Sequence, residues 1–460
     1  MRAEILTIGD ELCRGEIVDT NSSYLAARLW DLDITTRWMT SCTDDADDIA
    51  TAVTQAVTRA DLVVCSGGLG PTEDDLTVEV LARLVGAEVV IDEPAKARMM
   101  ERFGRLLSSQ APMPNMERAG EGPRAGSDIA ELTRIQLRQV RVPAGSRVHG
   151  NPVGLAPCFE VAVAGVPVVC LPGVPRELHG IFDAALAARF AELREATGQV
   201  ERIARRIYRA FGRGESQVSQ ACRGLVDGVP GASIHYQVKF PETLVKLVVR
   251  DRDQAAADAR LEALDAGVRE RLRGVIYGTG EKETLVERVT RRLIESGTTV
   301  ATAESCTGGQ LGELITRMPG SSKTFVGGAI TYSNAEKVRQ LGVKQATLDA
   351  HGAVSEETAL EMAQGAQSRF GVTAAVSITG IAGPDGGTPD KPVGTVWIAA
   401  WGISKATFHP DNVGQTLVFE RRTKKLSWPG ARDQIRLLSA WWALKLLDDL
   451  VDDLAPKDAS

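Results

Sequence analysis

A serine and a lysine in the last third of the chain have the residue types and settings of a nucleophile and its base. Ser305 lies in AESCTGG, where a predicted strand ends and a helix begins, and Lys337 lies in TYSNAEK, in the first turn of another predicted helix. Partial burial and the positive end of a helix both lower the pKa of a lysine, so its neutral amine can deprotonate a serine hydroxyl. Tyr332, at the end of the preceding strand, could orient the pair or relay a proton.

Two simpler roles compete with this interpretation. Ser305 could be a helix N-cap, which is a common position for serine, and Lys337 could be a solvated lysine on a helix surface. A histidine base has less support, because His351 and His409 are the histidines of this region and neither lies in a motif-like setting. Cys306 is expected to be a small packing residue that faces away from the site.

Glycine-rich segments near this pair could bring backbone donors to a substrate. Thr307-Gly308-Gly309 follows the serine directly, and ITGIAGPDGGTPDKPVG follows a predicted buried strand at 378–394. Such segments can surround a phosphate or an amide, although the second could equally be an ordinary loop. Arg432 and Arg436, one helical turn apart, could hold a phosphate in a bidentate manner or could simply be surface residues.

A second group of polar residues follows two predicted strands near the amino terminus. GDELCRGEIVDTNSSYL covers 9–25, and SGGLGPTEDDLT covers 66–77. Both glycine-rich turns should lie at the same edge of a sheet, where their N–H groups could hold a pyrophosphate. The residues that could bind a divalent cation there are Asp10, Glu11, Asp74 and Asp75. Such a cation would polarise a phosphoanhydride and activate water. In the alternative interpretation, the last two aspartates only cap the helix that starts at Leu76.

The elements that must position these residues alternate between short apolar strands and amphipathic helices in two regions. AEILTIG and DLVVCSG are predicted strands of the first region, and TTVATAES and TAAVSITG are predicted strands of the last. This alternation predicts an α/β fold for both regions, with a mainly parallel, doubly wound sheet in the first. The two regions share no obvious repeat, so they are expected to be separate α/β domains.

The predicted boundaries divide the chain into three parts. The first α/β domain is expected over 1–190, a small α+β module over 195–276, and the second α/β domain over 283–455. YGTGEKET at 277–284 is a predicted linker. The glycine- and proline-containing stretch within 101–138 predicts an exposed, mobile excursion from the first domain.

Composition narrows the classes of protein to which the chain can belong. With 460 residues, 43% of them hydrophobic and 25% charged, two or three globular domains are expected. A net charge of −7 gives no general attraction to polyanions and argues against DNA coating. The seven cysteines never approach CxxC spacing, so they predict reduced thiols and no zinc site. The sequence shows neither a signal-peptide core nor an apolar stretch of membrane length, which predicts a cytoplasmic protein.

The carboxy-terminal motifs resemble a known amidase. AESCTGG, GGAITYSNAEK, HGAVSEET and SITGIAGPDGG…KPVGTVWIA, in this order, are similar to the nicotinamide-nucleotide amidase domain of the CinA (competence/damage-inducible) family over about 285–445. That family hydrolyses the carboxamide of nicotinamide mononucleotide to nicotinic acid mononucleotide and ammonia, without a metal. The resemblance implies Ser305 as nucleophile, Lys337 as base and Tyr332 as helper. The implied substrate contacts are Thr307, Gly308, Gly309, Gly380, Gly383, Gly386, Gly387 and Arg432.

The amino-terminal motifs, with LPGVPREL at 171–178, resemble the molybdopterin-binding-like domain of the same family. That domain can act as a metal-dependent ADP-ribose pyrophosphatase, giving AMP and ribose 5-phosphate. The residues that the resemblance implies in substrate binding are Asn21, Gly67, Gly68 and Thr72, beside the four acidic residues expected to hold the cation. The family pattern GTAPG appears here as GLAPC, so Leu155 and Cys158 replace a threonine and a glycine. Losing a hydroxyl and a flexible glycine beside a phosphate site could weaken or reshape it.

The middle module resembles the small KH-like domain of the same family, and a spacer or dimerisation role is expected for it rather than RNA binding. Together these inferences predict a bifunctional cytosolic hydrolase of pyridine-nucleotide turnover, acting on nicotinamide mononucleotide and ADP-ribose. A divalent cation is expected at the first site and no cofactor at the second. A homo-oligomer, most simply a dimer, is expected, with no membrane or nucleic-acid partner. The rival hypotheses are a first domain that binds a pterin or nucleotide without turnover, and a non-enzymatic competence factor.

Overall fold

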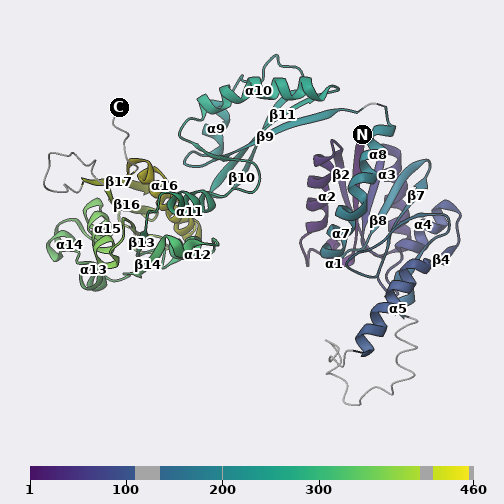
Figure 1. Cartoon of the computed structure of the whole chain (residues 1–460), viewed down its shortest axis with the longest axis horizontal. Coiled ribbons are helices and arrows are strands. Elements are labelled where there is room, and N and C mark those ends of the chain that lie inside the picture. The colour runs from purple at the N-terminus through teal and green to yellow at the C-terminus, as the bar shows by residue number, and fades with distance from the viewer. Residues whose placement is uncertain (109–134, 199, 405–417, 455–460) are drawn as a thin grey trace. The chain divides into compact units, whose positions relative to one another are not determined.

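The chain folds into two compact units, which are coloured by residue number in Figure 1. They comprise residues 1–203 with 251–254, and residues 204–250 with 255–460. The computed structural model describes residues 1–108, 135–198, 200–404 and 418–454. Most of the predicted excursion at 101–138 therefore lies outside the described residues. Its first part is not a loop, because it continues the helix α5 (Glu93–Ser108).

The amino-terminal domain is built on a six-stranded sheet with the order β2-β1-β3-β8-β7-β6. Its strands are β1 (Arg2–Ile8), β2 (Thr35–Cys42), β3 (Leu62–Ser66), β6 (Arg147–His149), β7 (Cys158–Val163) and β8 (Val166–Leu171). The first four in spatial order pair in parallel, and β7 and β6 are antiparallel. A separate antiparallel pair is formed by β4 (Val89–Ile91) and β5 (Arg141–Pro143). The sheet is thus mainly parallel, as predicted, with an antiparallel edge.

Apolar residues on both faces of these strands explain the helices on both sides of the sheet. Leu6 belongs to one core with residues of α3 and α4, whereas Ile5 belongs to another with residues of α2, α7 and α8. The helices are α1 (Asp10–Cys13), α2 (Thr20–Asp31), α3 (Ala46–Arg59), α4 (Thr77–Val85), α7 (Pro175–Ile181) and α8 (Ala187–Ala196), with the short turns η1 (Leu137–Val140) and η2 (Phe182–Leu186). The two cores confirm the predicted α/β domain.

The middle module contains a four-stranded sheet with the order β10-β11-β9-β12 and two helices. Its elements are β9 (Arg202–Ala210), α9 (Glu215–Ala221), β10 (Ala232–Lys239), β11 (Glu242–Asp251), α10 (Gln254–Arg271) and β12 (Ile276–Thr279). β12 pairs antiparallel with β9, so the first three residues of the linker predicted at 277–284 belong to this sheet. The predicted α+β class of the module is confirmed.

The carboxy-terminal domain has a five-stranded sheet with the order β14-β13-β15-β16-β17. Its strands are β13 (Val300–Glu304), β14 (Phe325–Ile330), β15 (Ala374–Gly380), β16 (Thr395–Ser404) and β17 (Val418–Ser427). Its helices are α11 (Leu285–Glu295), α12 (Gln310–Thr316), α13 (Asn334–Leu341), α14 (Gln345–His351), α15 (Glu356–Phe370) and α16 (Arg432–Leu454), with the turn η3 (Ser321–Lys323). β14, β13 and β15 are parallel, and β15, β16 and β17 are antiparallel.

Helices cover both faces of this second sheet because its strands are apolar on both faces. Val300 packs in a core with α11, α12 and α16, and the adjacent Ala301 packs in a core with α13, α14 and α15. The carboxyl ends of the parallel strands β13 and β14 lie at one edge of the sheet. The segments that follow these strands, which contain Ser305 and Lys337, are therefore brought to the same edge.

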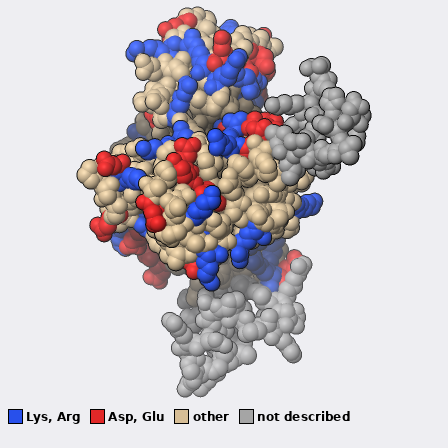
Figure 2. Space-filling model, turned by 90° about the vertical axis from the view of Figure 1, so that its left-hand side faces the viewer, with Lys and Arg blue, Asp and Glu red and all other residues tan. Residues whose placement is uncertain are grey.

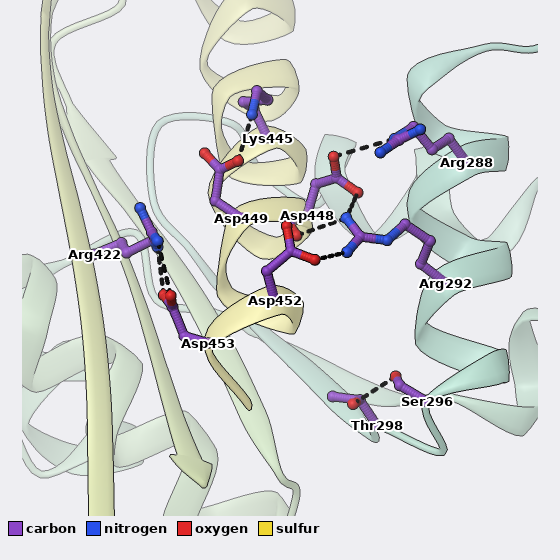
Figure 3. Close-up of polar contacts among 10 residues, drawn as sticks. All are labelled: Arg288, Arg292, Ser296, Thr298, Arg422, Lys445, Asp448, Asp449, Asp452 and Asp453. Carbon is purple, nitrogen blue, oxygen red and sulfur yellow. Dashed lines mark hydrogen bonds and ion pairs between the residues drawn. The ribbon is translucent and has the colours of Figure 1, made fainter. Parts of the chain in front are cut away.

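The long helix α16 is tied to α11 and β17 by ion pairs near its carboxyl end (Figure 3). Asp448 is 4% exposed and accepts hydrogen bonds from Arg288 at 3.2 Å and Arg292 at 2.5 Å. Asp453 pairs with Arg422 of β17 at 2.7 Å. These pairs fix the position of α16 against the sheet.

None of the described helices is both long enough and apolar enough to cross a membrane. Figure 2 shows acidic and basic side chains interspersed over the face in view. An alternation of charge of this kind does not form the continuous basic surface that nonspecific binding to a nucleic-acid backbone uses.

Candidate active sites

Ser305 and Lys337 lie side by side at the carboxyl edge of β13 and β14. The Lys337 Nζ donates to Ser305 Oγ at 3.0 Å. It also donates to the carbonyl oxygens of Thr331 at 2.9 Å and Tyr332 at 3.4 Å. Lys337 is 1% exposed, so the alternative of a solvated lysine is wrong. Ser305 is not a helix cap either, because Gly309 is the N-cap of α12.

Burial lowers the pKa of Lys337 to about 8. A neutral lysine amine has two N–H groups and one lone pair. The two backbone carbonyls can accept the two N–H groups, which leaves the lone pair for the proton of the Ser305 hydroxyl. The pair therefore has the geometry of a nucleophile beside a general base, and the amine becomes available as a base as the pH rises through about 8.

Cys306 is a poor candidate for the nucleophile. Burial raises the pKa of its thiol to about 12, so the thiol is protonated near neutral pH. The side chain is 5% exposed and packs in the core with Leu311 and Ala382, as the sequence predicted. It also lines the cavity beside Ser305, so the expectation that it faces away from the site is wrong.

Glu304 fixes the turn that follows the serine, and sequence reasoning missed it. Its carboxylate accepts hydrogen bonds from the N–H groups of Gly309, Leu311 and Gly312 at 2.9–3.0 Å. These N–H groups begin α12, so the positive end of that short helix faces Glu304 and not a substrate. A buried acidic residue directly before a strand-end nucleophile is the signal that could have revealed this role.

A cavity of about 260 Å³ opens beside Ser305 and Lys337. Such a volume lies near the small end of ligand cavities, which begin at about 300 Å³. Predicted residues that line it are Ser305, Tyr332, Lys337, Gly380, Gly383, Gly386 and Arg432. Thr307, Gly308, Gly309 and Gly387 were also predicted to contact substrate but do not line it. Residues that line it without having been predicted include Asn334, Thr379 and Asp385.

Both arginines at the start of α16 bind loops of this site, so neither is merely a surface residue. Arg432 donates to the Gly383 carbonyl and, at 3.3 Å, to the Tyr332 hydroxyl. Arg436 donates to the Thr307 carbonyl at 2.8 Å. Arg432 lines the cavity, whereas Arg436 is not among the described residues that line it. The Tyr332 phenol thus contacts Arg432, and it is the backbone of Tyr332 that binds the lysine.

A second cavity, of about 490 Å³, lies at the carboxyl edge of the amino-terminal sheet. Predicted residues that line it are Glu11, Gly67, Gly68, Thr72, Asp74 and Asp75. Asp10 and Asn21 were also predicted there but do not line it. Lining residues that sequence reasoning missed include Asp44, Gln139 and Glu177. Gly67 has a φ of +116°, and a Cβ there would collide with the Ile8 carbonyl, so the close approach of the loop to β1 requires glycine.

Asp75 braces the glycine-rich loop of this cavity. Its carboxylate accepts hydrogen bonds from the Gly70 N–H at 2.7 Å, the Thr72 N–H at 2.8 Å and the Thr72 hydroxyl at 2.5 Å. α4 begins at Thr77 without any side-chain cap. The alternative in which Asp74 and Asp75 only cap this helix is therefore wrong.

Asp44, which follows β2, adds a carboxylate to the same cavity. It accepts a hydrogen bond from the Asp10 N–H at 2.8 Å, and Asp10 itself forms an ion pair with Arg14. Burial raises the pKa of Asp44, and the like charges of Glu11 and Asp75 act in the same direction. Its position after a strand is the same signal that identified the other acidic residues, so sequence reasoning could have found it.

The two departures from the family pattern do not point into the cavity. Leu155 packs against the small core formed by Ala95, Met99 and Val140, and Cys158 is fully buried at the start of β7. Neither side chain lines the cavity. The segment between them therefore contributes to the site only through Ala156.

Asn21 connects two loops at the same sheet edge. Its Nδ2 donates to Ser66 Oγ at 3.0 Å and to the carbonyl of Gly173, a cavity residue, at 2.7 Å. Its described contacts are thus with protein groups that shape the cavity.

A divalent cation fits the amino-terminal cavity by charge. The carboxylates of Glu11, Asp44 and Asp74 line it, yet in the described ranges no three His, Cys, Asp or Glu side chains converge closely enough to hold a metal alone. Mg²⁺ is commonly held by one or two carboxylates together with water and substrate phosphates. The donor set suits a cation that binds jointly with a pyrophosphate.

Comparison with protein families gives three matches that together span most of the chain. Residues 4–192 match a probable molybdopterin binding domain, residues 205–278 match the damage-inducible protein CinA KH domain, and residues 282–451 match the CinA C-terminal domain.

Similar proteins cover nearly the whole chain. A CinA-like protein of Anaeromyxobacter dehalogenans is 39% identical over 97% of this chain and 99% of its own length. A putative competence-damage inducible protein of Symbiobacterium thermophilum is 39% identical over 97% of this chain and 98% of its own length. Among solved structures, the competence/damage inducible protein CihA of Agrobacterium tumefaciens is 36% identical, with a TM-score of 0.31, over 37% of this chain and 98% of that one.

Proposed function

Because the chain belongs to the CinA family, we propose that its carboxy-terminal domain hydrolyses the carboxamide of nicotinamide mononucleotide to nicotinic acid mononucleotide and ammonia. The observation that carries this proposal is the buried Lys337 amine, 3.0 Å from Ser305 Oγ beside a cavity. Family membership by itself supports only a CinA-type activity. The choice of amide and nucleotide comes from the motif resemblance together with this geometry.

The proposed reaction begins when Ser305 Oγ attacks the carboxamide carbon and Lys337 Nζ takes the hydroxyl proton. The lysine then gives this proton to the amide nitrogen of the tetrahedral intermediate, the C–N bond breaks with release of ammonia, and an acyl-serine ester remains. Water attacks this ester with the same amine as base, which releases the carboxylate product and restores the serine hydroxyl.

The oxyanion formed in both steps needs hydrogen-bond donors. In the described turn after the serine, the N–H groups of Gly308 and of residues 309–312 already have acceptors. Cys306 lines the cavity, so we assign its N–H group to the oxyanion.

Ser305→Ala and Lys337→Ala are expected to lose at least about two to three orders of magnitude in the rate of ammonia release from nicotinamide mononucleotide, because each removes one partner of the proton transfer. Cys306→Ala is the matched control, since it changes a neighbouring cavity residue without touching the pair. Circular dichroism should show that all three variants stay folded. An inactive Cys306→Ala beside a fully active Ser305→Ala would refute the assignment.

We further propose that the amino-terminal domain is a metal-dependent ADP-ribose pyrophosphatase, giving AMP and ribose 5-phosphate. The acidic cavity at the sheet edge supports this, because Glu11, Asp44 and Asp74 could hold the cation. The glycine-rich loop could bind the pyrophosphate through N–H groups other than those of Gly70 and Thr72, which Asp75 already accepts. When bound, the cation would supply charge neutralisation of the phosphoanhydride and an activated water.

The test is AMP production from ADP-ribose with Mg²⁺ or Mn²⁺. Asp75→Ala should abolish it, because the loop loses the brace that holds its N–H groups in place. Glu73→Ala is the matched control, since that neighbouring side chain is exposed and does not line the cavity. Binding of ADP-ribose without AMP formation by the unsubstituted protein would instead favour a domain that binds without turnover.

A cytoplasmic location and a homodimer also stay predictions. The rival hypothesis of a DNA-uptake factor has less support from the net charge of −7. Tight, salt-sensitive binding of DNA would revive it.

A further inference from the structure

The β10–β11 hairpin of the middle module contacts the carboxy-terminal domain close to the glycine-rich loop between β15 and β16, residues 380–394, which we call the substrate loop. Phe240 lies at the turn of this hairpin, and its ring stacks on that of Trp428 with 5.4 Å between centroids and 27° between planes. The indole also packs against Gly430, where a Cβ would collide with the ring. Both partners belong to the same compact unit of the chain.

The backbone of Trp428 contacts Gly394, at the carboxyl end of the glycine-rich loop that follows β15. Its N–H donates to the Gly394 carbonyl at 3.3 Å, and the Gly394 N–H donates to the Ile381 carbonyl at 2.8 Å. Gly394 has a φ of +91°, and a Cβ there would collide with the Trp428 carbonyl. Ile381 lines the catalytic cavity. Only glycine therefore permits this close contact between Trp428 and the loop.

The segment that begins at Trp428 also contacts the same loop at Gly383. Arg432, four residues further on, donates to the Gly383 carbonyl and to the Tyr332 hydroxyl. The loop is thus held at Gly394 and at Gly383 by one short stretch of chain, residues 428–432. A displacement of the Trp428 ring would disturb both contacts.

The base of the hairpin is anchored by a buried ionic cluster. Arg209 of β9 is 1% exposed and donates to the carboxylate of Glu242 at 2.9 Å, and the Tyr277 hydroxyl donates to the same carboxylate. Tyr277 in turn packs edge-on against Trp441 of α16. These contacts fix the start of β11, directly after the turn that carries Phe240.

We propose that Phe240 is a positioning residue for the carboxy-terminal site: through Trp428 it holds the substrate loop in the conformation that lines the cavity. The inference rests on the proposed amidase function for its kinetic consequence but not for its structural one. It gives the middle module a role in substrate binding by the neighbouring domain, in addition to that of a spacer.

Phe240→Ala in the full chain should raise the KM for nicotinamide mononucleotide about three- to tenfold. This is the factor expected when the interaction free energy of one aromatic pair is lost. Its kcat should change little, because Ser305 and Lys337 lie on other loops. Phe240→Tyr keeps the stacked ring and should keep the original KM. Val238→Ala is the matched control, since Val238 lies on the same hairpin and is 54% exposed.

Hydrogen exchange gives a second measurement that needs no activity. Backbone amides of residues 380–394 should exchange faster in Phe240→Ala than in the unsubstituted chain, and at unchanged rates in Phe240→Tyr and Val238→Ala. Unchanged exchange in Phe240→Ala would overturn the proposal. Acceleration spread equally over β13–β17 would also overturn it, because it would show a general loss of stability.

The two proposals can fail separately. If the unsubstituted chain releases no ammonia, the amidase function fails, while faster exchange confined to the loop still supports the positioning role. If ammonia is released and Phe240→Ala has the original KM and the original exchange rates, only the positioning role fails.

Discussion

The buried amine of Lys337 makes the carboxy-terminal site sensitive to pH. Burial disfavours the ammonium form and brings its pKa from the ordinary 10.5 down to about 8. The amine is the base only when neutral, so its active fraction increases as the pH rises through this pKa. A catalytic pKa near the working pH is what general-base catalysis favours.

We therefore expect kcat/KM for nicotinamide mononucleotide to rise roughly tenfold per pH unit below about pH 8 and to level off above it. The measurement is the initial rate of ammonia release at subsaturating substrate from about pH 6 to about pH 10. A profile that is flat, or that falls with rising pH over this range, would show that a neutral Lys337 is not the base.

At the residue scale, the sequence was most informative where a side chain follows a strand. Ser305 and Lys337 were predicted as a pair because the first lies at a strand end and the second at a helix start, and the structure brings them within hydrogen-bond distance. Their catalytic roles stay predictions. The contacts of Glu304 and Asp75 could not be predicted, because each carboxylate binds N–H groups whose direction depends on the folded turn.

At the scale of elements, the last turns of α16 carry an arrangement of charge that would lower the stability of an isolated helix. Four aspartates, Asp448, Asp449, Asp452 and Asp453, lie near the negative end of the helix dipole, where carboxylates are unfavourable. Arg288 and Arg292 of α11, Arg422 of β17 and Lys445 compensate for them (Figure 3). The packing of α16 in the domain thus offsets the unfavourable interaction of these carboxylates with the helix dipole.

Asp448→Asn should lower the free energy of unfolding of the carboxy-terminal domain by about 3 kcal/mol. This value is the lower end of the range of about 3–5 kcal/mol that is typical for breaking a buried ion pair, because both arginines remain partly exposed. The measurement is urea unfolding followed by tryptophan fluorescence, since five of the seven tryptophans lie in this domain. Asp449→Asn is the control, and its more exposed pair with Lys445 should contribute at most about 1 kcal/mol. Equal losses in the two variants would contradict this account.

Most elements were predictable from local patterns, and the exceptions have physical reasons. β1, β3, β13 and β15 are apolar on both faces, which is typical of central strands. Most of β12 was taken for linker, because a four-residue strand that contains Gly278 and is followed by Gly280 gives little periodic signal. It is stabilised by pairing with β9, which is distant in the sequence. The start of α12 was placed too early, since Glu304 rather than Ser305 satisfies its first N–H groups.

At the scale of the whole molecule, the two candidate sites lie in different compact units and use different chemistry. The amino-terminal cavity is lined by carboxylates, and the carboxy-terminal one by an amine, a hydroxyl and glycines. The residues that line the first cavity and those that line the second are entirely different. The proposed activities should therefore be separable within one chain.

Lys337→Ala should remove ammonia release and leave AMP production from ADP-ribose within about twofold, and Asp75→Ala should do the reverse, as expected for sites that share no residues. A metal chelator should act like Asp75→Ala, removing AMP production while leaving ammonia release unchanged. Both activities are measured on the same preparation of each variant. Loss of both activities in either folded variant would show that the sites depend on one another.

The number of folded parts was harder to predict from the sequence than their classes. The middle module was expected to be separated from the last domain by a linker, yet both fall in one compact unit. Phe211 packs against Trp441 and Trp442 of α16, with ring centroids 5.4 and 5.0 Å away. Single aromatic residues in unrelated segments show no pattern in the sequence that reveals such an interface.

The mixed sheet of the last domain separates reaction chemistry from ligand choice. The serine and the lysine follow strands of the parallel half, whereas the glycine-rich loop joins two antiparallel strands that are held in register from Gly380↔Val396 onwards. An insertion in a loop whose ends are clamped in this way leaves the strands undisturbed. Under the proposed amidase function, a change in the length of this one loop would alter which amides are accepted while Ser305 and Lys337 stay in place.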